Sequence, residues 1–258
     1  MKRYIMIGAP VTSVRTPPLL EAWFASRGVE AEVETRHLDP VDLGPFMKTF
    51  RANPDLDGLL VTMPHKKTIL AHLDHLTEEA AAAGSVNTVK RTATGNLIGS
   101  QFDGAGLVNA LLAKRIPVTA CRILLAGVGG AGMAIARAIA AHGCEHLAII
   151  EKKHELLGRV LKTLRGNDGC PVSPADKSEN QFDLLINATP LGMRPADACP
   201  FEDDLVRNAK FVADIVADPP ETRLAAMAAA SGKTLISGRD MVNGQIAPIG
   251  AWLLQREE

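Results

Sequence analysis

Two charged residues in the first half of the chain have the types that acid–base chemistry needs. Lys66 lies in residues 61–67 (Val-Thr-Met-Pro-His-Lys-Lys), directly after an apolar run, and Asp103 precedes a glycine and an amphipathic stretch. A lysine and a carboxylate placed together can carry a proton to or from a substrate hydroxyl. Each also has a simpler interpretation, because a lysine is usually solvated and an aspartate before a helix is usually its N-cap. His65 and Lys67 are interpreted as solvated surface residues.

A glycine-rich segment in the second half of the chain has the pattern of a phosphate-binding loop. Residues 127–132 fit GxGxxG and lie between an apolar run at 122–126 and a helical stretch at 133–142. Gly127 permits a tight turn, Gly129 lets the backbone approach a pyrophosphate, and Gly132 allows close packing of helix and strand. The phosphates then lie at a helix N-terminus, which favours anions. The predicted cofactor-binding residues of this segment are Gly127, Val128, Gly129, Gly130 and Ala131. The alternative is a packed strand–turn–helix without a ligand.

Glu151 ends the next predicted strand, 24 positions after Gly127. A carboxylate at this place accepts a hydrogen bond from the ribose 2′-hydroxyl and repels a 2′-phosphate. The sequence therefore favours NAD over NADP. Lys152 and Lys153 follow immediately and could reach a phosphate, so NADP stays possible. The alternative interpretation of the three residues is a solvated charge cluster at the start of a helix.

The elements that must position these residues alternate along the chain. Strands alternating with helices predict βαβ units and a largely parallel sheet. Two short strands flanking Thr94-Gly95-Asn96 predict a hairpin. A polar stretch at 165–180 is interpreted as a surface loop. Predicted strands are 4–8, 30–37, 58–62, 85–91, 97–100, 122–126, 146–150, 182–187, 211–214 and 234–237. Predicted helices are 18–26, 46–52, 67–73, 77–83, 104–114, 130–142, 155–164, 224–231 and 245–255.

Composition narrows the class of protein. The 258 residues allow one large or two modest domains. The net charge of −1 argues against a general nucleic-acid binder. No apolar run approaches the ~20 residues that span a bilayer, and the N-terminus is typical of a first strand, not of a signal peptide. We therefore expect a cytoplasmic protein with neither a nucleic-acid nor a membrane partner.

Cysteine and histidine usage gives no sign of a metal site or a disulfide framework. Cys121, Cys144, Cys170 and Cys199 are far apart and form no CxxC pair, so we predict four reduced thiols. The histidines lack paired ligand spacing with the cysteines. No coiled-coil pattern is present, and a monomer or a homodimer fits the composition equally well.

Several segments, in one order along the chain, resemble the shikimate/quinate dehydrogenase family. They are Gly8-Ala9-Pro10 through Thr16-Pro17, Val61-Thr62-Met63-Pro64-His65-Lys66, Gly84-Ser85-Val86-Asn87-Thr88, Phe102-Asp103-Gly104, the glycine loop, Asn187-Ala188-Thr189-Pro190-Leu191-Gly192-Met193, Asp214-Ile215 leading to Pro219, and Gly238-Arg239-Asp240-Met241-Val242-Asn243-Gly244-Gln245. The resemblance covers nearly the whole chain. Several motifs in one order are far more specific than any single one.

The resemblance implies an α/β fold of two domains with the active site in the cleft between them. Residues 1–103 plus 238–258 would form a discontinuous substrate-binding and catalytic domain with a mainly parallel sheet. Residues 104–237 would form a Rossmann dinucleotide-binding domain. The implied reaction is reversible hydride transfer between a nicotinamide cofactor, NAD or NADP, and a ring hydroxyl or ketone of shikimate, quinate or a related cyclic hydroxy acid.

The same resemblance implies roles for individual residues. Lys66 and Asp103 match the catalytic pair; whether Lys66 is the base or mainly an electrostatic stabiliser stays open. Thr62, Asn87 and Gln245 match positions that hydrogen-bond the ring hydroxyls of the substrate. Further expected cofactor-binding residues are Glu151, Lys152, Ala188, Thr189, Pro190, Ile215 and Met241.

The sequence departs from the family in the expected substrate pocket. The family's N-terminal loop usually carries two serines that hold the substrate carboxylate, and Val14 and Thr16 stand at those positions. Val14 cannot donate a hydrogen bond, whereas Thr16 can, and Ser13 or Arg15 could compensate. Phe102 replaces a small polar residue before the aspartate, and Ala217 replaces an expected tyrosine. Arg239 and Asp240 make the last motif more charged.

These departures predict retained hydride-transfer chemistry with altered recognition of the ring or the acid. Shikimate itself could then be a poor substrate, since a pocket built to hydrogen-bond a group discriminates by as much as ~10⁴-fold against its absence. Two alternatives remain open. One is a nucleotide-binding regulator that kept the fold and lost turnover, and the other is a folate-type dehydrogenase of related architecture.

Overall fold

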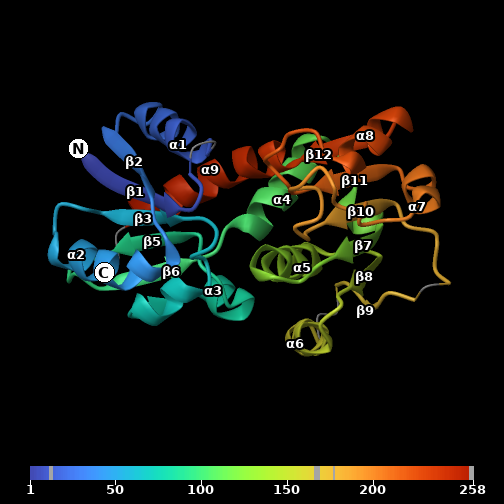
Figure 1. The fold of residues 1–258 in the computed structure, drawn as a ribbon, viewed down its shortest axis with the longest axis horizontal. Coiled ribbons are helices and arrows are strands. Elements are labelled where there is room, and N and C mark those ends of the chain that lie inside the picture. The colour runs from blue at the N-terminus through green and yellow to red at the C-terminus, as the bar shows by residue number, and fades with distance from the viewer. Residues whose placement is uncertain (12–13, 166–168, 177, 256–258) are drawn as a thin grey trace. The chain divides into compact units, whose positions relative to one another are not determined.

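The computed structural model describes residues 1–11, 14–165, 169–176 and 178–255, which group into two compact units. Unit 1 consists of Met1–Asp103 and Gln245–Glu258, and unit 2 consists of Gly104–Gly244. The chain leaves unit 1 at the start of helix α4 (Asp103–Ala113) and returns to it within helix α9 (Gly238–Leu254) (Figure 1). Residues 238–244, which form the first turns of α9, were expected in the first domain but group with unit 2.

Unit 1 is built on a mixed, mainly parallel sheet. Its strand order is β2-β1-β3-β5-β6-β4. Strand β1 pairs in parallel with β2 and β3, and β4 with β6, whereas β5 pairs antiparallel with β3 and β6 as the predicted hairpin requires. The bounds are β1 Lys2–Gly8, β2 Ala31–His37, β3 Gly58–Val61, β4 His75–Leu76, β5 Thr88–Arg91 and β6 Leu97–Ser100.

Helices cover both faces of this sheet because its strands alternate their apolar side chains. Tyr4 and Met6 of β1 pack in one cluster with α1 (Thr16–Ala25) and α9. Ile5 and Ile7 point the other way, into a cluster with α2 (Leu43–Ala52), a 3₁₀ helix at Thr68–His72 and α3 (Glu78–Ala83). Figure 1 shows α1 and α2 on opposite sides of the strands.

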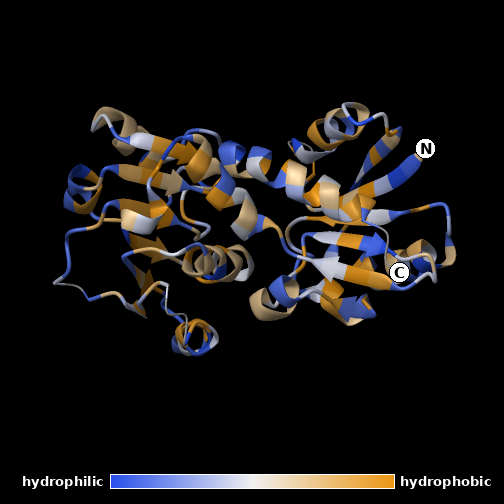
Figure 2. Ribbon diagram, turned by 180° about the vertical axis from the view of Figure 1, so that it is seen from behind, coloured by the Kyte–Doolittle hydropathy of each residue, from blue (hydrophilic) through white to orange (hydrophobic). Residues whose placement is uncertain are grey.

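Unit 2 has a fully parallel sheet of order β12-β11-β10-β7-β8-β9. These strands are mostly hydrophobic in Figure 2, as expected of parallel strands that helices cover on both faces. The strand bounds are β7 Arg122–Ala126, β8 His146–Ile150, β9 Val172–Pro174, β10 Leu184–Asn187, β11 Phe211–Asp214 and β12 Thr234–Ser237. The helices are α4, α5 (Gly130–His142), α6 (His154–Thr163), α7 (Asp203–Asn208), α8 (Arg223–Ala230) and the start of α9. The expected α/β class with two mainly parallel sheets is confirmed.

The structure corrects several details of the predicted elements. Strand β9 forms inside the polar stretch 165–180, where a surface loop was predicted, because β8 offers it a pairing edge. The predicted helix at 67–73 is a 3₁₀ helix over residues 68–72, and α7 was not predicted. Helix α9 begins at Gly238, seven positions before the expected start at Gln245.

Strand β9 also explains why the prediction of four reduced thiols is wrong for one pair. Cys144 and Cys170 are joined by a disulfide, with 4.9 Å between their Cα atoms. Each cysteine precedes a strand by two positions, and β8 and β9 lie side by side with Leu147 opposite Val172. The separation of 26 residues hid this neighbourhood. Cys121 and Cys199 are free thiols, as predicted.

The described residues form neither a membrane-spanning helix nor a group of metal ligands. No helix that they form has both the length and the apolar character needed to cross a membrane. Within the same residues, no three His, Cys, Asp or Glu side chains are grouped in a way that could hold a metal ion.

Candidate active site

The turn after β3 presents Lys66. Its Met63–Pro64 peptide is cis, and the His65 N–H donates to the Thr62 carbonyl at 3.0 Å. The Lys66 carbonyl accepts from the Val86 N–H at 2.7 Å, so the backbone of this residue is tied to the segment before β5. Lys66 therefore lies just after an apolar strand, as the sequence predicts.

His65 is completely buried, so its assignment to the solvated surface is wrong. Its Nε2 lies 2.7 Å from the carbonyl oxygen of Leu38. Leu38 follows β2 directly and His65 follows β3, so both lie beyond the carboxyl ends of strands that run in parallel within one sheet. A single-sequence pattern does not reveal that neighbourhood. Lys67 is exposed, as predicted.

Asp103 receives three side-chain contacts in unit 1. Lys66 Nζ lies 2.7 Å from its Oδ2. Asn87 Nδ2 and Gln245 Nε2 donate to its Oδ1 at 3.1 and 3.2 Å. The Asn87 amide also donates to Gln245 Oε1 at 3.2 Å. The structure thus brings four of the predicted site residues together, although they are far apart in the sequence.

This cluster joins a buried anion to a partly accessible cation. The side chain of Asp103 is 2% exposed, whereas that of Lys66 is 21% exposed. A carboxylate this deeply buried needs a counter-charge and hydrogen-bond donors, and the cluster supplies both. The ammonium group remains open on one side, where it can hold a proton for exchange with a substrate hydroxyl. The arrangement suits proton transfer by Lys66 under the control of Asp103.

The remaining predicted substrate residues lie on the turn of β3 and the loop before α1. Thr62 is half-buried, and Gly8 lies so close to it that an added Cβ would collide with its methyl group. Arg15 is the exposed N-cap of α1 and Thr16 is its first residue. Among the described residues, neither side chain makes a hydrogen bond or an ion pair. Ser13 lies outside the described residues.

Val14 and Phe102, the two apolar departures from the family pattern, lie on the same core of unit 1. Both pack against the core formed by β1, α1 and α9, and the Phe102 ring lies 5.7 Å from the Trp252 ring. The Phe102 N–H donates to Asn87 Oδ1 at 3.1 Å, which fixes Phe102 directly beside the polar residues. Helix α1 also carries proline at its second and third positions, which removes two N–H groups from its N-terminus.

The glycine loop of unit 2 has the backbone that the sequence predicts. Gly127 has φ +87°, in the region that favours glycine, and a Cβ on Gly132 would collide with the Gly127 carbonyl. Among the described residues, no atom beyond the two chain neighbours lies within 4 Å of a Cβ placed on Gly129, the N-cap of α5. The loop is therefore open to a ligand at Gly129, at the start of a helix of 13 residues. These features fit the pyrophosphate of a dinucleotide.

One further predicted segment lies against this loop, and a second lies against the start of α9. A Cβ on Gly127 would come within 2.8 Å of Thr189 Cγ2 and 3.0 Å of the Ala188 carbonyl. Pro190 continues that segment. Gly238 packs against the carbonyl of Ile215, and Met241 follows one turn later in α9. Ala188, Thr189 and Ile215 therefore lie at the carboxyl edge of the unit 2 sheet, as expected for cofactor contacts.

Glu151 follows β8 and holds the glycine loop. Its carboxylate accepts from the N–H groups of Val128 and Lys153, each at 3.0 Å. Burial alone raises the pKa of a carboxyl, but these backbone donors and that of Lys152 hold the pKa of Glu151 below its usual value. Glu151 is therefore an anion beside the loop, while the Lys152 side chain is exposed.

Sequence reasoning missed the interactions of Asp214, the last residue of β11. Asp214 is buried and accepts from Asn187 Nδ2 at 3.0 Å, Thr222 Oγ1 at 2.5 Å and the Val216 N–H at 3.2 Å. Burial raises the pKa of Asp214, although these hydrogen bonds offset part of that effect by lowering it. Asn187 also accepts from the N–H and the hydroxyl of Thr189. The sequence signal that could have indicated this contact is that Asn187 and Asp214 each end a predicted strand.

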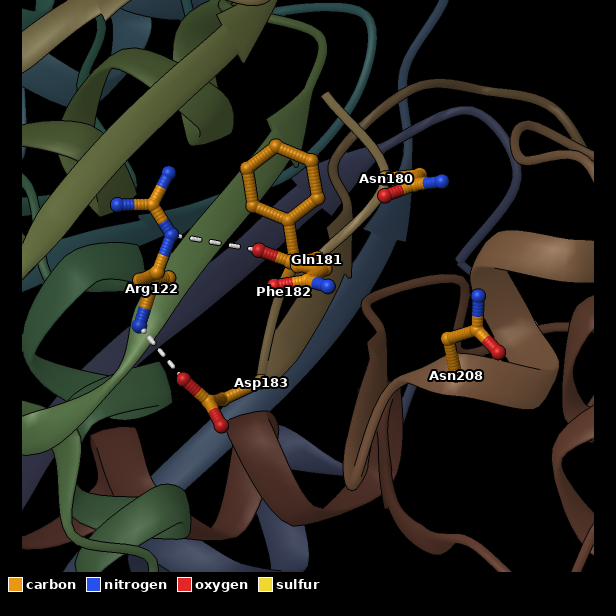
Figure 3. Close-up of a pocket in the computed structure, with 6 residues that line it drawn as sticks. All are labelled: Arg122, Asn180, Gln181, Phe182, Asp183 and Asn208. Atoms are coloured by element: carbon orange, nitrogen blue, oxygen red, sulfur yellow. Dashed lines mark hydrogen bonds between the residues drawn. The ribbon is translucent and has the colours of Figure 1, made fainter. Parts of the chain in front are cut away.

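A hollow of about 490 Å³ lies at the opposite edge of this sheet. Figure 3 shows Arg122, at the start of β7, reaching Gln181 and Asp183 through hydrogen bonds of its side chain and its backbone. The hollow contains no predicted site residue, and it lies at the amino ends of the strands. Ligands of open α/β sheets bind at the carboxyl ends, so the glycine loop and this hollow are separate features of unit 2.

Comparison with known proteins points to one family. Residues 6–89 match the family model described as "Shikimate dehydrogenase substrate binding domain". The chain is 33% identical over 256 residues to a protein of Desulfitobacterium hafniense named shikimate dehydrogenase (NADP(+)), covering 98% of this chain and 91% of that one. A protein of the same name from Rubrobacter xylanophilus is 32% identical over 242 residues, covering 92% and 85%.

Solved structures agree in fold over the whole chain. Shikimate 5-dehydrogenase from Thermus thermophilus, in complex with NADP(H) and shikimate, has a TM-score of 0.83 at 29% identity, covering 98% of this chain and 94% of that one. The ligand-free 5-ketofructose reductase of a Gluconobacter strain has a TM-score of 0.78 at 28% identity, covering 100% and 94%.

Proposed function

Because this chain belongs to the shikimate dehydrogenase family, we propose that it is an oxidoreductase that transfers a hydride between a nicotinamide cofactor and a ring hydroxyl or ketone of shikimate or a related cyclic hydroxy acid. The observation that carries the proposal is the contact of 2.7 Å between Lys66 Nζ and Asp103 Oδ2, in a cluster with Asn87 and Gln245. Among cyclic hydroxy acids, quinate is the other substrate to consider. An enzyme of this type serves aromatic amino acid biosynthesis.

The residues of the cluster can manage the proton of the reaction. When bound, the nicotinamide supplies the hydride acceptor for oxidation and the hydride donor for reduction. In oxidation, neutral Lys66 takes the hydroxyl proton at Nζ while the hydride leaves the carbon that bears this hydroxyl. In reduction, the Lys66 ammonium returns that proton to the oxygen that was the carbonyl. Asp103 orients Nζ and stabilises the positive charge that develops there during oxidation, which lowers the barrier in that direction.

Hydrogen bonding by the amides orients the substrate ring. Asn87 and Gln245 both donate to Asp103, and Asn87 also donates to Gln245, so both are fixed before the substrate arrives. Fixed donors and acceptors of this kind select a ring by the direction of its hydroxyls. Thr62, on the same turn as Lys66, adds a hydroxyl partner. We include Arg15, Thr16 and Ser13 as contacts for the substrate carboxylate.

We propose that Glu151 shifts cofactor preference toward NAD. Its carboxylate is held beside the glycine loop by two backbone N–H groups, where an anion repels a 2′-phosphate. The relatives named for NADP(+) and the exposed Lys152 and Lys153 favour the opposite preference. The two influences are separable, because only the phosphate distinguishes the cofactors.

A second candidate reaction is the reduction of a polyhydroxylated ketone without a carboxylate. It is favoured by Val14, which belongs to the loop expected to hold the carboxylate but packs against the apolar core of β1, α1 and α9. It is also favoured by the likeness to a 5-ketofructose reductase. The polar cluster of Lys66, Asp103, Asn87 and Gln245 would serve this reaction equally well.

The test is reduced-nicotinamide formation by purified protein with shikimate or quinate, with NAD and NADP in separate assays. Oxidation of NADH or NADPH with 5-ketofructose tests the second candidate. Turnover with a cyclic acid supports the main proposal, and turnover with 5-ketofructose alone supports the second. Binding of nucleotide without turnover of any of the three compounds contradicts both and favours a regulator.

A further inference from the structure

A closed ring of hydrogen bonds joins both ends of the Lys66–Asp103 contact. The Lys66 carbonyl accepts from the Val86 N–H at 2.7 Å, and Val86 follows Ser85. Ser85 Oγ accepts from Gln101 Nε2 at 2.9 Å, and Gln101 Oε1 accepts from the Asp103 N–H at 3.0 Å. Lys66 Nζ and Asp103 Oδ2 close the ring at 2.7 Å. All of these residues belong to unit 1.

We propose that Gln101 is a positioning residue for the reaction, and that it sets the contact between Lys66 and Asp103 through this ring. Gln101 and Ser85 are 3% and 0% exposed. Gln101 Oε1 takes the N–H of Asp103, the first residue of α4, where backbone N–H groups lack partners within the helix. Its amide nitrogen ties that helix start to the segment that also anchors the Lys66 backbone.

The ring acts on geometry that catalysis depends on. A catalytic pair must stay within about 0.5 Å of its productive arrangement, held by residues whose own side chains are locked. A misplacement of about 1 Å can cost 10²-fold in rate. Without Gln101, Asp103 keeps its side-chain partners but loses one of the links that fix its backbone relative to Lys66. The inference rests on the proposed function for its kinetic arm only.

The first arm of the test measures how firmly Lys66 is held, without any assay of turnover. The protein is treated briefly with acetic anhydride, and acetylation of Lys66 relative to its exposed neighbour Lys67 is read by mass spectrometry. Gln101→Met keeps the length of the side chain and removes both hydrogen bonds. We expect it to raise the Lys66:Lys67 ratio several-fold, toward the ratio of Asp103→Asn, and Ser85→Ala to raise it less.

A matched control separates positioning from general loosening of unit 1. Thr77 is the half-buried N-cap of α3, and its hydroxyl also contacts Ser100 Oγ at 3.1 Å. Neither contact belongs to the ring. Thr77→Val should lower the thermal midpoint without changing the Lys66:Lys67 ratio. The proposal is overturned if Gln101→Met leaves the ratio at the wild-type value, or if Thr77→Val raises it as much as Gln101→Met does.

The second arm is a double-mutant cycle on kcat. A residue that acts only through Asp103 has no further effect once Asp103 is changed. We expect Gln101→Met to lower kcat by about 10- to 100-fold in the wild-type background and by less than about twofold in Asp103→Asn. Equal losses in both backgrounds would show a structural role and overturn the proposal. A wild-type protein without turnover contradicts the proposed function instead, and the acetylation arm still decides the role of Gln101.

Discussion

Asp103 in unit 1 and Asp214 in unit 2 are both buried aspartates that receive three hydrogen bonds, yet the charges of their partners differ. Asp103 faces one cation, Lys66, and two amides. Asp214 faces an amide, a hydroxyl and a backbone N–H, all of them neutral. The same side chain therefore serves two purposes. A carboxylate with a partly exposed cation can control a proton, whereas one with neutral donors holds loops together.

The three donors of Asp214 come from three separate segments. Asn187 belongs to the motif that lies against the glycine loop, Val216 follows β11, and Thr222 caps α8. Because the pKa of Asp214 is raised in the folded state, its contribution to stability is complete below the ordinary carboxyl pKa of about 3.9. That contribution is lost as the pH rises through the raised pKa. Asp214 thus ties three segments of unit 2 together through neutral donors.

The largest effect expected from this comparison is that of Lys66→Met. Removing the proton carrier should lower kcat by about 10³-fold, within the range that general acid–base groups contribute. Nucleotide affinity should stay within about twofold, because the glycine loop belongs to the other unit; calorimetric titration with NAD and NADP checks this. An equal loss of kcat and nucleotide affinity would remove the distinction between the two regions.

Thr222→Val should weaken the loop-holding region. It removes the hydroxyl that donates to Asp214 and caps α8, and each lost bond costs roughly 1–2 kcal/mol. The matched control is Thr77→Val, which removes an N-cap without a carboxylate partner. The thermal midpoint should fall several degrees further for Thr222→Val. Equal falls would mean that the neutral donors of Asp214 contribute nothing beyond capping.

Glu151→Ala extends the comparison to a third carboxylate, which is held by backbone donors at the glycine loop. Loss of this anion should lower the NAD:NADP ratio of kcat/KM by about tenfold, equivalent to ~1.4 kcal/mol. Steady-state kinetics with both cofactors measures it. Lys152→Ala is the opposite control and should raise the ratio. A ratio unchanged by Glu151→Ala excludes this residue from cofactor choice.

Val14→Ser, in the loop before α1 of unit 1, should have the smallest effect. A new hydroxyl that reaches a substrate carboxylate gains about 0.5–1.5 kcal/mol, so KM for shikimate should fall a few-fold with kcat unchanged. Val14→Ala is the control for altered packing alone. If both variants behave alike, the acid is recognised elsewhere, and Arg15→Gln becomes the informative change.

The sequence allowed the α/β class, most strands and the Lys66–Asp103 pair to be predicted, because each depends on local pattern or on motifs in order. The hydrogen bonds of Gln101 and Ser85 were not predictable in this way. They depend on the register of β5 and β6, which places Thr88 opposite Ser100 and thus brings residue 101 beside the segment before β5. His65 and the Cys144–Cys170 pair were misjudged because their partners lie beside other strands of the same sheet, which a local sequence pattern does not show.

The most direct test of the contrast between the two carboxylates is to measure kcat and the thermal midpoint for Asp103→Asn and Asp214→Asn side by side. We predict that Asp103→Asn lowers kcat by at least about 10²-fold and changes the midpoint less than Asp214→Asn does. Asp214→Asn should lower the midpoint by about 2–4 °C while kcat at saturating cofactor stays within about threefold of wild type. A large loss of kcat from Asp214→Asn, or full activity in Asp103→Asn, would contradict the account.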